Sequence, residues 1–541
     1  MTTSPQYYQE IVADPLDVDR VYSLNTYTSF TEDGGKTFNR LGNKFRHVDD
    51  HAMWIQPTNP DHFLIGGDGG VYETFDRAKT WNFKPNLPVT QFYRVAVDDA
   101  EPFYNVYGGT QDNFSLGGPS RTTSRVGIVN SDWFVTNGGD GFQSRVDPTN
   151  LNIVYAQSQY GWLVRYDKKS TEDMGIKPIE GMDVEPYRWN WDSPLIISPF
   201  DPNRLYFAAN KLFRSNDRGN SWQVISPDLS RQIDRNKLPV MDKVWGVDAV
   251  SKNASTSLYG NIVALTESPL KEGLLYVGTD DGLIQVSDDG SKTWRKIEKL
   301  PGVPEYTYIS FLRASQHDQN AVYATCDNHK NSDFKPYVLK STDRGKSWKS
   351  ISGNLPVNGP VYTIAEDHGN PNLLFVGTEF GVFFTVDGGN KWIQLKGGLP
   401  TIAIKDIAIQ KRENDLVLAT FGRSFYILDD YSPLREAADN SLEAGNAIFP
   451  VKDCWMYIQS RTGTGEEGHS FFSADNPPFG ATFTYFLKDT IRTQKQIRQE
   501  KEKQLRKEGK PVPYPSWAEI RAEDDVQPPY LIFEISDLTD E

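Results

Sequence analysis

Short apolar segments alternate with polar turns along most of the chain, and the alternation repeats. In each repeat an apolar segment ends at a turn rich in Pro, Asp or Asn, and a second apolar segment follows around one large anchor residue. The nine anchors are Tyr22, Leu64, Tyr107, Tyr155, Tyr206, Tyr276, Tyr323, Phe375 and Val417. Their spacing is 42 to 52 residues, except for 70 residues between Tyr206 and Tyr276. Repeats of about this length are typical of four-stranded β-propeller blades, so the pattern predicts nine blades.

A second motif, Ser/Thr-x-Asp-x-Gly-x-Ser/Thr-Trp, recurs six times and is most complete at Ser341–Trp348. Asp and Ser/Thr side chains accept hydrogen bonds from the N–H groups of a turn, and Gly permits a positive φ. The Trp begins the next strand and buries a large apolar surface. The motif therefore predicts a hairpin turn in which the Asp is structural, at Asp33, Asp76, Asp217, Asp289, Asp343 and Asp387.

The two kinds of turn assign the faces of each blade. The Pro/Asp turn joins strand A to strand B, and the six-fold motif joins strand C to strand D, so both lie on one face. The B–C and D–A loops lie on the other face, where propellers usually place binding sites. The 70-residue interval between the anchors Tyr206 and Tyr276 contains an insertion rich in Asp, Lys, Asn and Ser, from Ser226 to Ser257. We expect this insertion to form a long loop.

Three domains are expected from these patterns. Residues 1–430 are the propeller blades, 431–470 a linker, and 471–541 a truncated β-sandwich with strands at Ala481–Phe486 and Tyr530–Ile535. Within the last part, residues 489–510 are dense in Lys, Arg, Gln and Glu, which predicts a solvated helix or a disordered insert. The chain starts directly on a repeat without a signal peptide, so we expect a fragment of a longer protein.

Composition excludes several classes of function. The formal net charge of −15 argues against a nucleic-acid partner, which needs a basic surface. No apolar run is long enough to span a membrane. The two cysteines, Cys326 and Cys454, cannot build a disulfide framework or a cysteine-type metal site. No phosphate-binding loop or nucleophile elbow is present, so no cofactor is expected.

The six-fold motif is the Asp-box, and on it the chain resembles the Asp-box (BNR-repeat) β-propellers: sortilin-type receptor domains, family-74 xyloglucanases and sialidases. A closer resemblance, to bacterial proteins labelled "glycosyl hydrolase" or sortilin-like, is carried by the runs His47–Trp54, Gly66–Gly70, Tyr107–Asn113 and Phe421–Phe425. It implies an all-β multi-bladed propeller, an immunoglobulin-like sandwich after it, and a secreted or periplasmic protein. Sortilin closes ten blades and xyloglucanases form two rings of seven. Nine blades favour the end of one ring followed by a complete second ring.

Polar residues gather on the predicted binding face. Four residues after each of the first eight anchors stands Thr26, Asp68, Gln111, Gln159, Asn210, Asp280, Asp327 or Glu379. The D–A loops add Arg46, His47, Asp49, Asp50, His51, Asp140, Arg188, Trp189, Trp191 and Asp192. The alternative interpretation is that each of these residues only shapes its turn, since Asp and Asn favour tight turns.

Two functions fit this face. The first is a scaffold that binds a peptide, a protein or a glycan, because no catalytic pair can be identified by spacing. The candidate ligand-binding residues are His47, His51, Gln111, Arg188, Trp189, Trp191, Asp280, Asp327, Glu379 and Arg423. The alternative is a glycoside hydrolase acting on a polysaccharide, which needs two carboxylates across a sugar. The candidates for that pair are Asp49, Asp50, Asp68, Asp112 and Asp140, with Trp54, Trp189 and Trp191 as stacking platforms.

A metal site is not expected at His47-x-Asp49-Asp50-His51. The two histidines are four residues apart, which suits a helix, whereas this segment is predicted to run from a loop into a strand. We expect His51 to be a loop residue that hydrogen-bonds to a neighbouring carboxylate. A sialidase is disfavoured because its Arg-Ile-Pro motif is absent and an arginine triad from Arg46, Arg188 and Arg423 has no pattern to support it.

Overall fold

The computed structural model describes residues 7–250, 252, 258–437, 445–460 and 468–534. The chain folds into two compact units. One comprises Met1–Ala438 and Lys452–Thr482, and the other comprises Asp439–Val451 and Phe483–Glu541. The expected strand residue Ile535 and part of the insertion, residues 251 and 253–257, lie outside the described residues.

Among its described residues the first unit contains nine antiparallel sheets of three or four strands, each built by strands in chain order, and one two-stranded sheet. Two sheets come first: β1 (Ile11–Ala13), β2 (Val21–Ser23), β3 (Ser29–Thr31), β4 (Asn39–Arg40), and β5 (Asp50–Ile55), β6 (Phe63–Gly67), β7 (Gly70–Thr74), β8 (Asn82–Phe83). The next three are β9 (Phe92–Val97), β10 (Asn105–Thr110), β11 (Ser115–Pro119), β13 (Phe134–Asn137); β14 (Gly141–Val146), β15 (Ile153–Ser158), β16 (Trp162–Asp167), β17 (Asp173–Gly175); and β18 (Leu195–Ile197), β19 (Leu205–Ala208), β20 (Leu212–Ser215), β21 (Gln223–Val224).

Four more sheets follow. They are β22 (Ile262–Glu267), β23 (Leu275–Thr279), β24 (Ile284–Ser287), β25 (Arg295–Ile297); β26 (Tyr308–Ala314), β27 (Val322–Asn328), β28 (Asp333–Ser341), β29 (Lys349–Ser350); β30 (Val361–Glu366), β31 (Leu374–Thr378), β32 (Gly381–Thr385), β33 (Ile393–Gln394); and the three-stranded β34 (Ile404–Gln410), β35 (Asp415–Thr420), β36 (Phe425–Leu428). Short 3-10 turns are η1 (Asn130–Asp132), η2 (Gln159–Gly161), η3 (Arg235–Lys237) and η4 (His329–Asn331).

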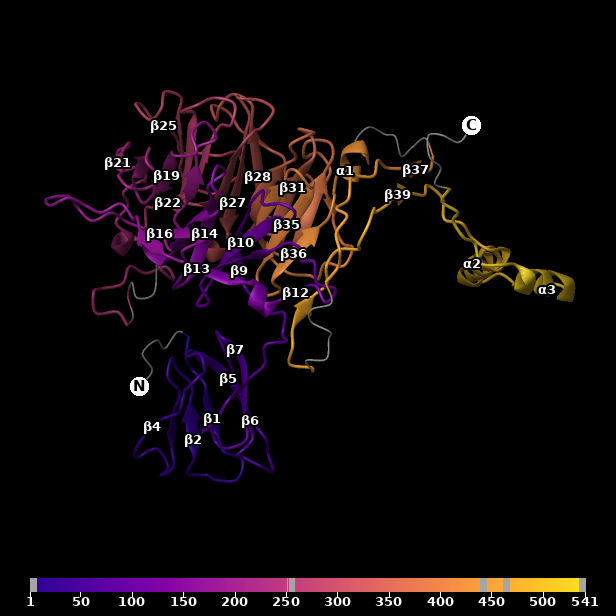
Figure 1. Cartoon of the computed structure of the whole chain (residues 1–541), viewed down its shortest axis with the longest axis horizontal. Coiled ribbons are helices and arrows are strands. Elements are labelled where there is room, and N and C mark those ends of the chain that lie inside the picture. Colours follow the sequence, from indigo (N-terminus) through magenta and orange to yellow (C-terminus); the bar gives the residue numbers. More distant parts are fainter. Residues whose placement is uncertain (1–6, 251, 253–257, 438–444, 461–467, 535–541) are drawn as a thin grey trace. The chain divides into compact units, whose positions relative to one another are not determined.

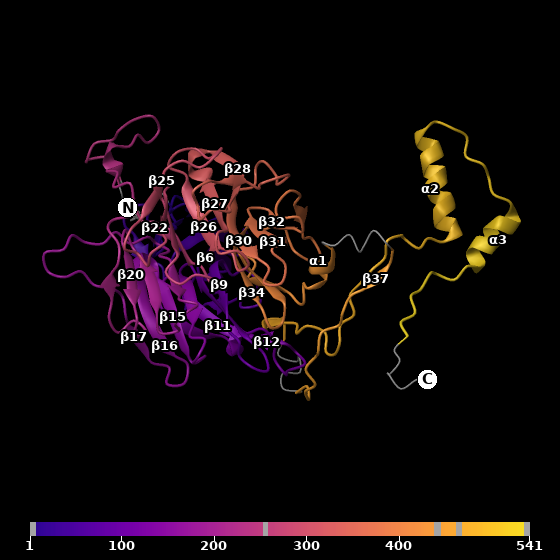
Figure 2. The ribbon, with the colours of Figure 1, turned by 90° about the horizontal axis from the view of Figure 1, so that it is seen from above.

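The seven sheets from β9 to β36 close into a ring. Their first strands contact one another in succession, and the last of them, β34, contacts β9. The closing contacts include a bridge between Gln91 and Phe421 and a hydrogen bond of 3.0 Å from the Tyr104 hydroxyl to Asp415. Figure 1 shows β9 and β10, in purple, beside β35 and β36, in orange, and Figure 2 shows β9 beside β34. The ring is a seven-bladed propeller, and the two sheets before it are not part of it.

The anchors are the centres of the blades. The eight anchors other than Leu64 are at most 2% exposed. Leu64 pairs with Trp54 across the strands, and the two lie on the opposite face from the buried Phe63 and Ile65. Leu64 therefore has the strand position that was predicted for an anchor, but it is not buried. In this sheet the neighbouring residues Phe63 and Ile65 form the packed core instead.

The Asp-box turns form as expected and repeat one set of hydrogen bonds. At Ser341–Trp348 the Ser341 hydroxyl donates to Asp343 at 2.8 Å and accepts from the N–H of Gly345 at 2.7 Å, while Asp343 also accepts from the N–H of Ser347 at 2.8 Å. Bonds from Ser347 hold the pKa of Asp343 at about 2. A carboxylate held in this way closes the C–D hairpin.

The region after the ring differs from the prediction in part. The expected linker begins with a short helix, α1 (Pro433–Glu436), that is fixed to the ring: the buried Tyr431 donates to Asp367 at 2.6 Å, and Arg435 pairs with the same carboxylate. The strand β38 (Ser473–Ala474) pairs with β12 (Ile128–Val129), which also belongs to the first unit. A linker would have polar, unpaired residues, whereas Tyr431 is 1% exposed.

The second unit has only one small sheet among its described residues, β37 (Ala447–Ile448) with β39 (Tyr485–Phe486), and two helices, α2 (Gln494–Lys507) and α3 (Trp517–Asp525). Helix α2 fills most of the charged segment 489–510, in agreement with the helical alternative. It starts at a capping box of Thr493 and Gln496. Residues 530–534 do not form the expected strand. The β-sandwich, which needs more paired strands than this, stays a prediction.

Replacing Trp392 by Ala tests the Asp-box packing. Its indole is 3% exposed and its N–H donates to the carbonyl of Ile351 at 2.8 Å. We expect the variant to lose about 3–5 kcal/mol of unfolding free energy, as buried aromatic truncations do. The matched control is Phe38→Ala, at the same position of another box but 55% exposed, which should stay within about 0.5 kcal/mol. Equal losses in thermal unfolding would contradict a packing role for the box aromatic.

Candidate functional site

Two copies of Gly-Gly-Asp-Gly place carboxylates at strand ends. Asp68 follows Gly67 in the loop between β6 and β7, and Asp140 precedes Gly141, the first residue of β14. A Cβ on Gly67 would lie 2.3 Å from the carbonyl oxygen of Asp49, and one on Gly141 would lie 2.3 Å from that of Phe114. Glycine is required at both positions because neighbouring backbone packs against them. The same backbone approach brings the acidic loops together.

Asp112 links these loops into one cluster. Its N–H donates to Asp140 at 2.8 Å, and the side chain of its neighbour Asn113 donates to the carbonyl of Asp68 at 2.7 Å. Asp112 and Asp49 both have left-handed backbone conformations, with φ of 62° and 67°. Non-glycine residues held in that region often mark functional sites. We call Asp49, Asp68, Asp112 and Asp140 the acidic cluster.

Two carboxyls of the acidic cluster, Asp112 and Asp140, retain protons more strongly than isolated carboxyls do. Burial and the nearby charge of Asp68 raise the pKa of Asp112 to about 6. Burial, and secondarily the charge of Asp112, raise the pKa of Asp140 to about 6. Both causes disfavour a second negative charge in the same space. Carboxyls that hold a proton near neutral pH are suited to donate it, so the cluster has the chemistry of a general acid.

Aromatic residues border the cluster on two sides. The His51 ring stacks on Tyr8 with centroids 5.2 Å apart, and its Nε2 lies 3.1 Å from Asp68. His51 has the expected carboxylate neighbour, but it belongs to strand β5 and not to a loop. On the Asp140 side, Tyr160 meets the edge of Trp191 at 4.8 Å. Tyr160 is 37% exposed, so this pair offers aromatic surface to solvent. In the described ranges no group of three or more His, Cys, Asp or Glu is arranged to hold a metal ion.

Several residues proposed from sequence have structural bonds instead. Asp50 forms an ion pair with Arg46 in which both side chains are 1% exposed, and it accepts from Thr28 at 2.6 Å. Trp189 is 5% exposed and packs between Phe207 and Phe213. Neither a buried, paired carboxylate nor a buried indole can meet a sugar, so the sequence-based roles of Asp50 and Trp189 were wrong.

The other ligand-binding candidates are spread around the sheets. His47 bonds to the carbonyl of Val48, Arg188 pairs with Asp228 at 2.7 Å, and Arg423 is exposed. Trp54 is 49% exposed and meets His62 edge-on. The contacts of His47, Arg188 and Trp54 all involve partners outside the acidic cluster. These contacts therefore do not assign the three residues to the cluster, and exposure alone does not assign Arg423 to it.

The post-anchor series mostly shapes loops. Asp280 accepts from the N–H groups of Gly260 at 3.0 Å and Asn261 at 2.7 Å, and burial raises its pKa to about 7. Asn210 accepts from the N–H of Arg188, and Gln159 from that of Asp140. Asp327 bonds to His329, and Gln111 and Glu379 each accept from a tyrosine of their own blade. The turn interpretation fits these residues, since each secures the loop that enters the next strand.

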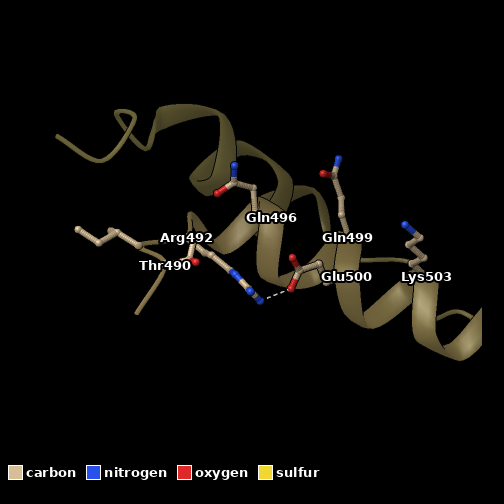
Figure 3. Close-up of a pocket in the computed structure, with 7 residues that line it drawn as sticks. Thr490, Arg492, Gln496, Gln499, Glu500 and Lys503 are labelled. Atoms are coloured by element: carbon tan, nitrogen blue, oxygen red, sulfur yellow. Dashed lines mark hydrogen bonds and ion pairs between the residues drawn. The ribbon is translucent and has the colours of Figure 1, made fainter. Parts of the chain in front are cut away.

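A hollow of about 290 Å³ lies in the second unit, along one side of α2 (Figure 3). Its walls come from residues 490–503 alone, and Arg492 and Glu500 pair across it. Gln496, Gln499 and Lys503 project from α2, and Thr490 lies in the segment before it. A hollow built by one exposed helix has no converging catalytic groups, so it is not our candidate site.

Part of the sequence signal for the site was visible and part was missed. The run Gly66–Gly70 contains Gly-Gly-Asp-Gly, and Gly138–Gly141 repeats it. The shared Gly-Gly-Asp-Gly singles out Asp68 and Asp140 among the acidic residues of the chain. No spacing along the chain indicates that Asp112 joins them, because the contact is made between sheets.

The comparisons with known proteins agree on one class of relative. A xyloglucanase of Acetivibrio thermocellus is 26% identical over 276 residues, which are 45% of this chain and 30% of that protein. A probable oligoxyloglucan-reducing end-specific xyloglucanase of Neosartorya fischeri is 25% identical over 210 residues, 38% of this chain and 23% of the relative. A xyloglucanase of Paenibacillus sp. is 23% identical over 256 residues, 42% of this chain and 23% of the relative. The chain spans less than a third of the length of these relatives.

No family model matches the chain. Among solved structures, a GH74 enzyme of Niastella koreensis covers 77% of this chain and 76% of its own at 12% identity. Its TM-score of 0.25 is too low to compare the arrangement of the two chains.

The acidic cluster should make stability depend on pH in a defined direction. A carboxyl whose folded-state pKa of about 6 exceeds its unfolded value near 4 destabilises the fold as pH rises through that window. Replacing Asp112 by Asn removes one charge and keeps a side chain that tolerates a left-handed backbone. We expect the variant to be more stable than the wild type at pH 7.5, by about 1 kcal/mol after allowing for solvent screening, and equal to it at pH 4.

Thermal unfolding across this pH range measures the effect. Asp343→Asn is the control, because bonds from Ser347 lower its pKa and its loss should destabilise at neutral pH. If the unfolding free energy of Asp112→Asn followed pH in parallel with that of the wild type, the raised pKa of Asp112 would be contradicted.

Proposed function

We propose that this protein is a glycoside hydrolase that acts on a β-glucan-type polysaccharide such as xyloglucan, with the acidic cluster as its catalytic centre. One observation carries the proposal: two carboxyls, Asp112 and Asp140, hold protons with pKa values of about 6 beside further carboxylates. Glycoside hydrolysis needs one carboxyl that is protonated near neutral pH and a second one facing it. The xyloglucanase relatives support the same chemistry and the substrate class.

In this proposal Asp112 or Asp140 is the general acid that protonates the leaving-group oxygen. Asp68 supplies the second carboxylate, which activates a water molecule or attacks the sugar. The charge of Asp68 also helps to keep the proton on Asp112. Asp49 lies at the edge of the cluster and accepts a hydrogen bond from Tyr8, so its part is to position that tyrosine.

Aromatic surface next to the cluster supports a sugar ligand. Tyr160 and Trp191 form an edge-to-face pair, and the backbone of Asp140 is held by Gln159, the residue before Tyr160. Pyranose rings present apolar C–H faces that pack on aromatic rings, much as other apolar groups do. Tyr160 therefore becomes the stacking residue, in place of the buried Trp189.

The competing function is a scaffold that binds a peptide, a protein or a glycan without chemistry. The acidic composition and the paired or loop-bound state of Arg188, Asp280 and Glu379 fit both functions, but a binding surface does not need carboxyls crowded enough to raise each other's pKa. The proposal also includes an extracellular location, where polysaccharides are met. In the described part of the chain no helix is long and apolar enough to cross a membrane.

Reducing ends released from xyloglucan measure the activity. We expect Asp68→Asn, Asp112→Asn and Asp140→Asn to lower the rate of release. Loss of the general acid or of the second carboxylate should each lower that rate at least about 10²-fold. Activated aryl glycosides, whose leaving group needs no proton, should restore the rate of the general-acid variant but not that of the variant lacking the second carboxylate.

Asp280→Asn is the matched control. Asp280 occupies the same position after its anchor as Asp68 and its pKa is raised to about 7, yet it bonds only to loop backbone and side chains of its own blade. It should leave the rate unchanged. Binding of xyloglucan without release of reducing ends would contradict the hydrolase and favour the scaffold, and unchanged rates in all three cluster variants would contradict this site.

A further inference from the structure

A β-bulge recurs at one position of the ring, near the start of the first strand of a blade. In six of the seven blades the pairing of the first strand with the second shifts register there, whereas β18 pairs without a shift. The residues at the bulges are Tyr93, Phe142–Gln143, Val263, Ser310, Tyr362 and Lys405. A bulge leaves its extra residue unpaired and re-aims the side chain, and bulges are frequent next to active sites. The bulged residues are therefore candidates for a ligand site at this end of the strands.

The bulged residues differ between the two sides of the ring. The blades that start at β30, β34, β9 and β14 are successive neighbours across the ring closure. Their bulges carry three aromatic rings and one ammonium group, those of Tyr362, Lys405, Tyr93 and Phe142. The blades that start at β22 and β26 carry the smaller Val263 and Ser310. The large side chains of this position thus gather on one arc of the ring.

Phe421 adds a ring to this arc. It stands four residues after the anchor Val417, at the position where the other eight repeats carry a polar residue. Its N–H donates to the carbonyl of Ala403 at 2.9 Å, and its backbone forms the bridge with Gln91 that helps to close the ring. The Phe421 ring lies 5.8 Å from that of Tyr93. The exception in the polar series therefore belongs to an aromatic surface that the closure assembles.

Lys405 lies at the centre of this surface without a hydrogen-bonding partner. Its Nζ is 3.5 Å from the ring centroid of Tyr362 and 4.8 Å from that of Phe421. Among the described residues the half-buried Lys405 forms neither a hydrogen bond nor an ion pair. An ammonium group has three N–H donors, and contact with ring faces leaves them without acceptors. These donors are free to bind the oxygen atoms of a ligand.

An acceptor stands in the same group of residues. The hydroxyl of Tyr362 donates to the carboxylate of Glu379, which is also half-buried. Rings with one cationic donor and one carboxylate acceptor suit a neutral ligand that has both apolar faces and hydroxyl groups. An anionic ligand would meet the Glu379 carboxylate.

The arc begins beside the acidic cluster. The hydroxyl of Tyr93 donates to Gln111, the residue before Asp112. On its other side the Tyr93 ring stacks on Phe142, with centroids 4.9 Å apart. A ligand that follows the rings from Tyr93 to Tyr362 would therefore start at the acidic cluster. We call Tyr93, Tyr362, Lys405 and Phe421 the closure patch.

We propose that the closure patch binds neutral sugar units of a polysaccharide that extends from the acidic cluster. Lys405 donates to sugar hydroxyls, Glu379 accepts from them, and the faces of Phe421 and Tyr93 pack on the apolar C–H faces of the sugars. The inference rests on the proposed function for the identity of the polysaccharide. A chain held here has several units on one side of the bond that is cut, so efficient hydrolysis should need a long substrate.

Binding of xyloglucan oligosaccharides tests the patch without relying on turnover. Calorimetric titrations use the full chain with Asp112→Asn, so that the sugar stays intact. In this background Lys405→Met should raise Kd at least about tenfold, as loss of a charge-assisted hydrogen bond does. Phe421→Asn should also raise Kd several-fold, and Asn already occupies the same post-anchor position at Asn210.

Lys211→Met is the matched control. Lys211 is a half-buried lysine whose Nζ lies 5.8 Å from the ring centroid of Tyr187, but it comes from the β19–β20 loop, outside the arc. This variant should bind the oligosaccharides as its background does. Equal affinities of the Lys405 and Lys211 variants would overturn the patch even if Phe421→Asn fails to fold, and so would the absence of oligosaccharide binding before any patch residue is changed.

Kinetics separate the patch from the hydrolase. With Asp112 intact, Lys405→Met should raise KM for xyloglucan and leave the hydrolysis of an aryl glycoside with a single sugar unit unchanged, whereas a merely structural role would lower both activities. Oligosaccharide binding that depends on Lys405, without release of reducing ends, would overturn the hydrolase and support the patch. Release of reducing ends with the same KM in the wild type and Lys405→Met would overturn the patch and leave the hydrolase standing.

Discussion

Closure of the ring is the constraint on which the remainder of the structure depends. A β-sheet leaves unpaired edges, and a propeller protects them by packing each blade between two neighbours. Here the last blade has only three strands, β34 to β36, yet it meets the first through the Gln91–Phe421 bridge and the bond from Tyr104 to Asp415. Since sequence separates these partners by more than 300 residues, every blade between them must pack against its neighbours for the ring to close.

Well-packed sheets can hold charges that a looser fold would expel. The acidic cluster crowds carboxyls until two of them keep protons near neutral pH, and Asp49 and Asp112 have left-handed backbones. Arg313 has a buried Nε without a hydrogen-bond partner among the described residues. Each arrangement opposes folding, and each persists because well-packed blades supply the compensating stability. Unfavourable local chemistry on a rigid scaffold is what points to function at the acidic cluster.

Most acidic residues on the loops have the opposite character. Asp280, Asp343 and Asp50 are each held by N–H groups, hydroxyls or an arginine, and their carboxylates complete turns or buried pairs. Asp280 has a raised pKa even so, with burial as the main cause. A shifted pKa therefore does not identify a candidate in this protein by itself. Asp112 is a candidate because the carboxyl of Asp68, which comes from a different sheet, also raises its pKa.

The sequence by itself determined the blades, because their signals are local. Turn chemistry at Ser341–Trp348 and anchor spacing near 42–52 residues act within one hairpin or one repeat, so both were predicted correctly without knowledge of the ring. The tertiary structure alone decided which residues meet. Asp68, Asp112 and Asp140 come together, and Asp50 and Trp189 are buried, through contacts between sheets whose separation no spacing along the chain encodes. Backbone hydrogen bonding in a turn is set by adjacent residues, whereas burial and the distance between two charges are set by the packing of whole blades.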